Sequence, residues 1–120
     1  MVMRLYMSYN TKEFHDADSL LLSAEFKDYG EFRKKFGPPT GQEPIHIAVR
    51  QISSAYELLG FLLHSKLIDF SMVRAIFQVE SHWEKIRPIA EAARKAYNDP
   101  TYLMYFEYLY DEWKAAQKKV

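Results

Sequence analysis

The sequence YELLGFLL at residues 56–63 is followed, after a short polar break, by DFSMVRAIF at residues 69–77. Apolar side chains recur at three- and four-residue steps on both sides of the break, the period that aligns one face of an α-helix. Before the break they are Ile45, Val49, Ile52, Tyr56, Leu59 and Leu63, and after it they are Met72, Ile76, Val79, Trp83 and Ile86. The pattern predicts two helices that form a central antiparallel hairpin.

The break between these two helices carries the signals of a helix start. Asp69 can accept a hydrogen bond from the free amides of the next first turn, and Ile68 and Val73 occupy the positions of a hydrophobic staple. Gly60 lies inside the first helix, where glycine costs about 1 kcal/mol relative to alanine. We therefore expect a neighbouring helix to pass close to Gly60.

Similar signals divide the chain before the hairpin into helices. Asn10 and Asp28 each precede a glutamate by three residues, which is the spacing of a capping box. The helix after Asp28 should stop at Gly37, because the two prolines that follow cannot continue it. Pro44 suits the first turn of the central helix.

Prolines also shape the expectation for the C-terminal half. Pro88 lies inside the apolar stripe, where it removes a backbone hydrogen bond, so we expect a kink or a break near residues 85–87. Asp99 and Pro100 predict the cap and the first residue of a terminal helix that runs to about Lys118. Since no strand pattern occurs, the sequence predicts an all-α fold, an irregular bundle of roughly five or six helices in a single domain over residues 1–120.

Composition excludes several classes of protein. The absence of cysteine removes disulfides and thiolate chemistry and fits a reducing compartment, so we expect a cytoplasmic location. The chain has 16 basic and 16 acidic side chains, which leaves no net field to attract a polyanion, so we expect no nucleic-acid partner. No stretch reaches the length of about twenty apolar residues that a membrane span requires, so we expect no span in this chain.

No group of residues specifies a reaction, a metal or a cofactor. Glu43 and His46 form an E-x-x-H spacing, but it occurs once, whereas a carboxylate-bridged metal site uses the motif twice. We therefore expect no metal site and interpret His46 as a surface histidine. His64 and His82 are expected to cap helices or line the surface. Phosphate-loop and nucleophile motifs are missing, so we expect no catalytic residue and no cofactor.

Glu57 and Glu80 are the residues of an alternative hypothesis, a small-ligand-binding or hydrolytic domain. Glu80 lies on the margin of the apolar stripe, where half-burial would raise its pKa, and Glu57 is a similar candidate. The simpler interpretation is that both carboxylates pair with arginine or lysine. A cleft that holds at least two groups from the set of Glu57, Glu80 and a tyrosine hydroxyl would favour the alternative.

The terminal helix has apolar or aromatic side chains on every side, from Tyr102 to Tyr110. One face of a helix cannot bury them all. We therefore predict that a second face, centred on Tyr105, Tyr108 and Glu112, forms a homodimer or binds another protein partner. The simpler interpretation is that the two tyrosines lie on the surface with their hydroxyls in water. The leading hypothesis is a non-enzymatic interaction or scaffold module.

A series of short motifs resembles a known family. The motifs are Glu57-Leu58-Leu59-Gly60, Ile68-Asp69, Trp83-Glu84, Pro88, Arg94, Asn98-Asp99-Pro100 and Phe106-Glu107-Tyr108-Leu109. Their order is similar to that in the small all-helical domain-of-unknown-function family numbered 4760, whose members carry Gly or Lys at the hairpin together with the Ile-Asp pair. The resemblance runs from about Asn10 to Trp113. The resemblance implies a helical fold with no established activity and identifies no catalytic residues. It suggests that this chain is a soluble portion related to membrane-attached proteins.

Overall fold

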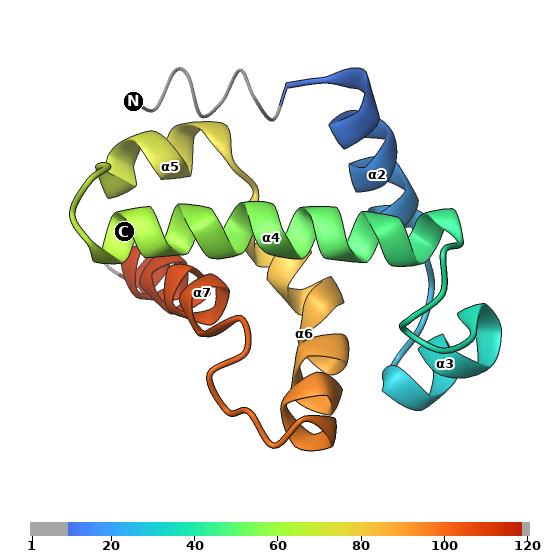
Figure 1. Cartoon of the computed structure of the whole chain (residues 1–120). Helices are drawn as coiled ribbons and strands as arrows, with labels where there is room; N and C mark the ends of the chain where they lie inside the picture. The colour runs from blue at the N-terminus through green and yellow to red at the C-terminus, as the bar shows by residue number, and fades with distance from the viewer. Residues whose placement is uncertain (1–9, 119–120) are drawn as a thin grey trace.

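The computed structural model describes residues 10–118, which form six helices (Figure 1). They are α2 (Lys12–Ser23), α3 (Tyr29–Phe36), α4 (Pro44–His64), α5 (Phe70–Ile76), α6 (Val79–Ala96) and α7 (Met104–Lys118). No strand occurs among the described residues, so the predicted all-α fold is confirmed. The domain boundaries that we expected, residues 1–120, extend beyond this range at both ends.

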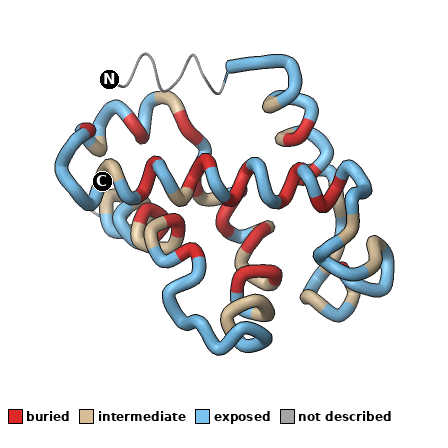
Figure 2. The backbone as a smooth tube through the Cα atoms, viewed as in Figure 1, coloured by how far each residue is buried: buried red, intermediate tan, exposed pale blue. Residues whose placement is uncertain are grey.

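Helix α4 crosses the whole fold, and the other helices are arranged around it (Figure 1). It packs most extensively against α7 on one side and against α2 on the other. Buried residues recur along its length, as Figure 2 shows. The largest fully buried side chains of the single core are Trp83, Phe32 and Phe106, which come from α6, α3 and α7. The core therefore gathers around one long central helix.

The second arm of the predicted hairpin is two helices instead of one. Phe77 and Gln78 separate α5 from α6, and the backbone of Phe77 is extended, with φ −112° and ψ 147°. Phe77 is buried and lies 6.1 Å from the ring of Tyr56, measured between ring centroids. Met72 is 42% exposed, so its place in the predicted apolar stripe was wrong. The interruption of the helix at Phe77 allows the Phe77 ring to be buried in the core.

The turn between α4 and α5 uses a left-handed residue. The amide of Leu67 donates to the carbonyl of Leu62 over 2.9 Å, and that of Lys66 donates to Leu63 over 3.0 Å. This is the Schellman pattern, and Lys66 takes its left-handed position with φ 61°. The Asp69 side chain then accepts from the Ser71 amide, which confirms the predicted cap of α5.

The other predicted start signals hold with one correction. The Asp28 carboxylate accepts from the Glu31 amide over 2.8 Å, and Pro44 occupies the first turn of α4, as expected. The cap of α2, however, is the Thr11 hydroxyl, which accepts from the Phe14 amide over 3.2 Å. The predicted cap, Asn10, instead uses its side-chain oxygen to contact the exposed ring of His15. Asn10 and Thr11 are both residue types that can cap a helix, and Thr11 is the one that caps α2.

The C-terminal half required two corrections. We expected a kink or a break near residues 85–87, and the break is absent because helix α6 is continuous through Pro88. Helix α7 begins at Met104 and not at Pro100, because the Asp99 carboxylate accepts from the amide and the hydroxyl of Thr101 and holds a turn there. These two hydrogen bonds lower the pKa of Asp99. Leu103 follows in the left-handed region with φ 56° and leads into α7.

Candidate functional site

Glu57 of α4 supplies the cap of α7 from another helix. Its carboxylate accepts a hydrogen bond of 2.8 Å from the amide of Phe106, the third residue of α7. The amides of a first helical turn have no partner within the helix, and Leu103 before the helix has no side-chain acceptor. Burial raises the pKa of Glu57, although the amides of Phe106 and Tyr105 and the charge of Arg94 act to lower it.

Gly60 lies one turn after Glu57 and allows α7 to approach. A Cβ atom at Gly60 would stand less than 3.0 Å from the carbonyl oxygen of Tyr105. The prediction that a neighbouring helix passes close to Gly60 is therefore confirmed. The missing side chain lets the Phe106 amide come within reach of Glu57.

Arg94 of α6 fastens the other side of the start of α7. Its Nε donates to the carbonyl of Tyr102 over 2.8 Å, and its guanidinium pairs with Glu107 at 2.7 Å. The same group lies 5.9 Å from the centroid of the Trp83 ring. Trp83 in turn packs on Phe106, with centroids 5.0 Å apart.

Six of the residues that carried the family resemblance thus meet at one place. We call them the α7 clamp, and they are Glu57, Gly60, Trp83, Arg94, Phe106 and Glu107. Each of them seats α7 against α4 or α6. Because holding α7 in place is a structural role, the occurrence of these six residues in the family motifs does not by itself indicate a reaction.

Glu80 is half-buried, as expected, but its neighbours reverse the expected shift of its pKa. Its carboxylate pairs with Lys114 at 2.9 Å and accepts from the Gln117 amide group over 3.1 Å. The hydrogen bonds from Lys114 and Gln117 lower the pKa of Glu80, so the predicted raised pKa was wrong. The simpler interpretation, a carboxylate paired with a lysine on a neighbouring helix, is confirmed for Glu80.

An open groove of ≈ 680 Å³ lies between α4 and the start of α7. Glu57, Tyr102 and Tyr105 line it, whereas Glu80 is not among its lining residues. The hydroxyl of Ser53 also belongs to this groove and is buried without a hydrogen-bond partner. Burial raises the pKa of Tyr102, and Tyr97 and Glu57 act in the same direction. The structure thus brings together one candidate carboxylate and two tyrosines.

Beside this groove the aromatic side chains of α4 and α7 form a continuous surface. The ring centroids of Phe61 and Tyr105 lie 5.4 Å apart, and His64 lies 5.4 Å from Tyr105 and 5.0 Å from Tyr108. Burial raises the pKa of Tyr108, and Glu112, to which it is hydrogen-bonded, acts in the same direction. We call Leu58, Phe61, His64, Tyr105, Tyr108 and Glu112 the α4–α7 face.

The α4–α7 face is only partly covered by the fold. Tyr105 and Tyr108 are half-buried, while Leu58 and Phe61 are 46% and 41% exposed. On the other side of α7, Phe106, Leu109 and Tyr110 are buried in the core. Helix α4 therefore accounts for part of the second apolar face of α7 and leaves part of it to solvent.

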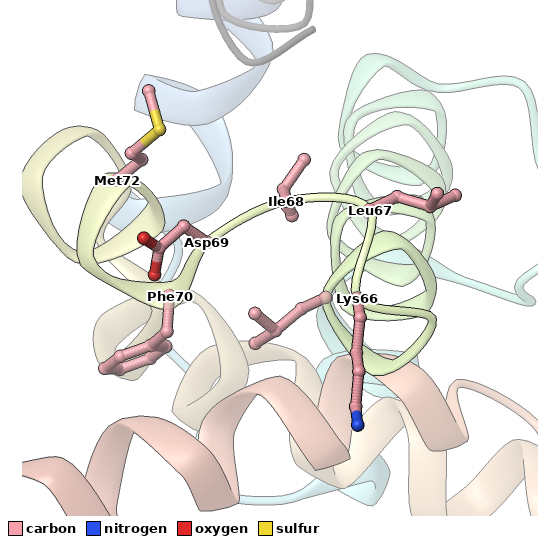
Figure 3. Close-up of a pocket in the computed structure, with 7 residues that line it drawn as sticks. Lys66, Leu67, Ile68, Asp69, Phe70 and Met72 are labelled. Carbon is pink, nitrogen blue, oxygen red and sulfur yellow. The ribbon is translucent and has the colours of Figure 1, made fainter.

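A second open pocket, of ≈ 620 Å³, lies at the turn between α4 and α5 (Figure 3). Lys66 and Phe70 extend toward α7 in this view, and Met72 extends to the opposite side (Figure 3). The one carboxylate in its lining, Asp69, already caps α5. The pocket offers an apolar surface rather than a reactive group.

His82 was expected at the surface, but it is buried, with 3% exposed. Its Nε2 contacts the carboxylate of Asp18 in α2, its Nδ1 contacts the carbonyl of Gln78, and its ring stacks on Tyr56 with centroids 4.8 Å apart. Sequence reasoning missed both His82 and Asp18. The spacing of His82 after Val79 and before Ile86, on the apolar stripe, was the signal that indicated burial.

His46 is also buried, with 2% exposed, so its interpretation as a surface histidine was wrong. Its Nε2 donates to the carbonyl of Phe36 over 2.7 Å and lies 3.7 Å from the Glu43 carboxylate. The hydrogen bond satisfies a free carbonyl at the end of α3. No three side chains of the metal-binding types gather within residues 10–118 in a way that could hold a metal ion.

Searches of known proteins identify a family but no characterised relative. The family model described as "Domain of unknown function (DUF4760)" matches residues 2–113, and the chain therefore belongs to this family. No curated protein and no solved structure matches the chain. None of the described helices is both long enough and apolar enough to cross a membrane.

Proposed function

We propose that this family member is a non-enzymatic interaction module, a single helical domain that pairs with a second copy of itself through the α4–α7 face. The observation that carries the proposal is the chain of ring contacts from Phe61 through Tyr105 and His64 to Tyr108, beside an open groove. Interfaces are enriched in tyrosine and phenylalanine, because such rings bury a large area with few rotatable bonds.

A second copy suits this face because the face is chemically self-complementary. It carries a hydrogen-bond acceptor, the Glu112 carboxylate, and a ring that can donate a hydrogen bond, His64, both in contact with Tyr108. A two-fold axis through the face would bring unlike groups of the two copies together. The net charge of +0 at pH 7 adds no long-range repulsion between copies.

The engagement of the two candidate carboxylates supports a non-enzymatic role. Glu57 accepts from the Phe106 amide, and Glu80 is paired with Lys114. Each carboxylate therefore has a role in stabilising the fold.

The absence of cysteine from the chain supports our proposal of a cytoplasmic location, which fractionation of the source cells tests.

Light scattering at several protein concentrations tests the pairing. We expect a mass that rises from one chain to two, and a dimer that Leu58→Glu and Tyr105→Glu both dissociate, because each introduces a charge into the apolar contact. Tyr97→Glu is the matched control, since Tyr97 is 69% exposed and lies outside the face. Circular dichroism must show intact helices in all three variants. A mass of one chain at every concentration refutes the pairing.

A ligand-binding or hydrolytic function in the groove is a second candidate, favoured by the presence of Glu57 and Tyr102 in one lining. A carboxylate with a raised pKa beside a phenol is a pair that can transfer protons. Hydrolysis of nitrophenyl esters by the native chain and by Glu57→Gln tests it. A rate that is the same in both proteins excludes Glu57 as the reactive group.

A further inference from the structure

A cavity of ≈ 320 Å³ lies between α3, α4 and α6, away from the α4–α7 face. Its inner wall is apolar, since Phe32, Val49 and Ile89 are buried there. The half-buried Ala92 and Ala93 of α6 add short side chains that leave space open. The volume is at the lower end of the range of small-molecule sites, roughly 300 to 1,000 Å³, so the cavity suits a compact ligand.

The polar part of the lining consists of two arginines, three tyrosines and His46, whose Nε2 already donates to the Phe36 carbonyl. Arg33 of α3 and Arg50 of α4 contribute guanidinium groups, and Tyr29, Tyr97 and Tyr102 contribute phenols. None of the residues that line this cavity is an aspartate or a glutamate. Their positive charge is thus not balanced within the cavity, which favours an anion there.

Arg50 is held in place by neutral partners. Its two terminal nitrogens donate to the carbonyls of Pro39 and Gly41 over 3.0 and 3.2 Å. The ion pairs among residues 10–118 include neither Arg50 nor Arg33. Each terminal nitrogen keeps a second N–H and Nε keeps its own, so a guanidinium that is fixed by carbonyl groups keeps its charge and has donors left for a carboxylate.

The walls that carry these groups are already joined to one another. The buried His46 on α4 donates to the carbonyl of Phe36 at the end of α3, which ties α3 to α4 beside the cavity. Arg94 holds the carbonyl of Tyr102, which keeps the segment after α6 close to α4 and α7. Since the backbone walls are held together before any ligand arrives, binding has to order mainly exposed side chains such as that of Arg33.

We propose that this cavity binds a small amphipathic carboxylate, whose ring or short chain lies on Val49, Ile89 and Ala93 and whose anionic group is bound by Arg33 and Arg50. The site is separate from the proposed dimer face, and the two proposals stand or fall independently. The phenols of Tyr97 and Tyr102 donate hydrogen bonds to the same anionic group.

The test uses 2-naphthoate as the probe and 2-naphthalenemethanol as its neutral counterpart, in titrations of the full chain followed by two-dimensional NMR. We expect saturable binding of the naphthoate, with shifts of the Val49 and Ile89 amides, and about tenfold weaker binding of the alcohol. Arg33→Gln should weaken naphthoate binding about tenfold by removing the charge. Ala93→Leu should abolish the binding of both compounds by filling the cavity.

Arg74→Gln is the matched control, because Arg74 is an exposed arginine of α5 that does not line the cavity, and its affinity for naphthoate should equal that of the native chain. Arg33 is also exposed, so its variant remains informative if Ala93→Leu fails to fold. The proposal is overturned by the absence of saturation at millimolar naphthoate, by equal affinity for the alcohol, or by unchanged affinity in Arg33→Gln.

Discussion

The carbonyl oxygen of Tyr105 in α7 occupies the space beside Gly60 of α4 in which a side chain would begin. Alanine is the better helix former by about 1 kcal/mol in an open helix. At residue 60 we nevertheless expect Gly60→Ala to lower the free energy of unfolding by about 1 to 3 kcal/mol, because the two backbones must separate. Urea denaturation measures the loss.

Gly30→Ala provides the matched control for this substitution. Gly30 lies in α3, and the nearest atom to an added Cβ is at 3.4 Å, an ordinary contact. We expect this variant to gain about 0.5 to 1 kcal/mol. A gain at both positions would contradict the close approach of α7 at Gly60.

Two substitutions at Glu57 separate its cap from its charge. Glu57→Ala leaves the Phe106 amide without its acceptor and should cost about 1 to 2 kcal/mol at pH 7. Glu57→Gln keeps an acceptor oxygen and has no charge to bury, so its loss should be smaller. Equal losses in the two variants would show that the hydrogen bond contributes little.

The raised pKa of Glu57 also predicts a pH dependence. Because folding favours the protonated carboxyl, the stability gained by protonating Glu57 is fully present below the unfolded value of 4.5 and is lost as the pH rises through the folded pKa, whereas the hydrogen bond from the Phe106 amide is still made at pH 7. The native chain should therefore gain stability relative to Glu57→Gln as the pH is lowered from 7 to 4. Thermal unfolding of both proteins at each pH measures this difference, and a difference that does not change with pH refutes it.

Glu80 should show the opposite dependence. The hydrogen bond from Lys114 lowers its pKa, so its contribution is present above 4.5 and is lost as the pH falls through the folded value. Glu80→Gln should lower the melting temperature at pH 7, and the two proteins should converge in acid. Salt at about 1 M should reduce the difference at pH 7, because the pair is partly exposed to solvent. A difference insensitive to both salt and acid would point to packing instead.

Trp83 is 1% exposed and packs on Phe106 and Tyr110. Trp83→Ala should cost about 3 to 5 kcal/mol, because it leaves a large cavity between α6 and α7. Trp83→Phe should cost much less. The indole nitrogen of Trp83 is buried without a hydrogen-bond partner, so its removal leaves no other polar group unpaired. Chemical denaturation of both variants tests this, and a loss below about 1 kcal/mol for alanine would place the side chain outside the core.

Lys66 holds a left-handed conformation that glycine adopts without strain. We expect Lys66→Gly to raise the free energy of unfolding by about 0.5 to 1 kcal/mol by relieving this strain. Ser65→Gly is the control, since Ser65 has φ −82° and should only lose stability. A loss in both variants would mean that the greater freedom of glycine in the unfolded chain outweighs the relief.

Most of the helices and their local ends could be predicted from the sequence. The ends of these helices depend on residues within one or two turns, so nearby sequence predicts them. Examples are the caps at Asp28 and Asp69, the end of α3 at Gly37 and the start of α4 at Pro44. The apolar period of α4 identified the helix that crosses the fold. Even the close approach at Gly60 was predictable, because a glycine inside a strong helix pattern has a local cost that only a neighbour explains.

Which side chains those helices bring together depends on how the helices pack against one another. Helix α7 is capped by Glu57, which lies 49 residues away in sequence from Phe106. His82 is buried because α2 brings Asp18 to it, and Phe77 interrupts a helix because the core beside Tyr56 accepts its ring. Such contacts join side chains from separate helices, and no local spacing encodes them. The physical reason is that burial and hydrogen-bond satisfaction are settled by packing, after each helix has formed its own backbone bonds.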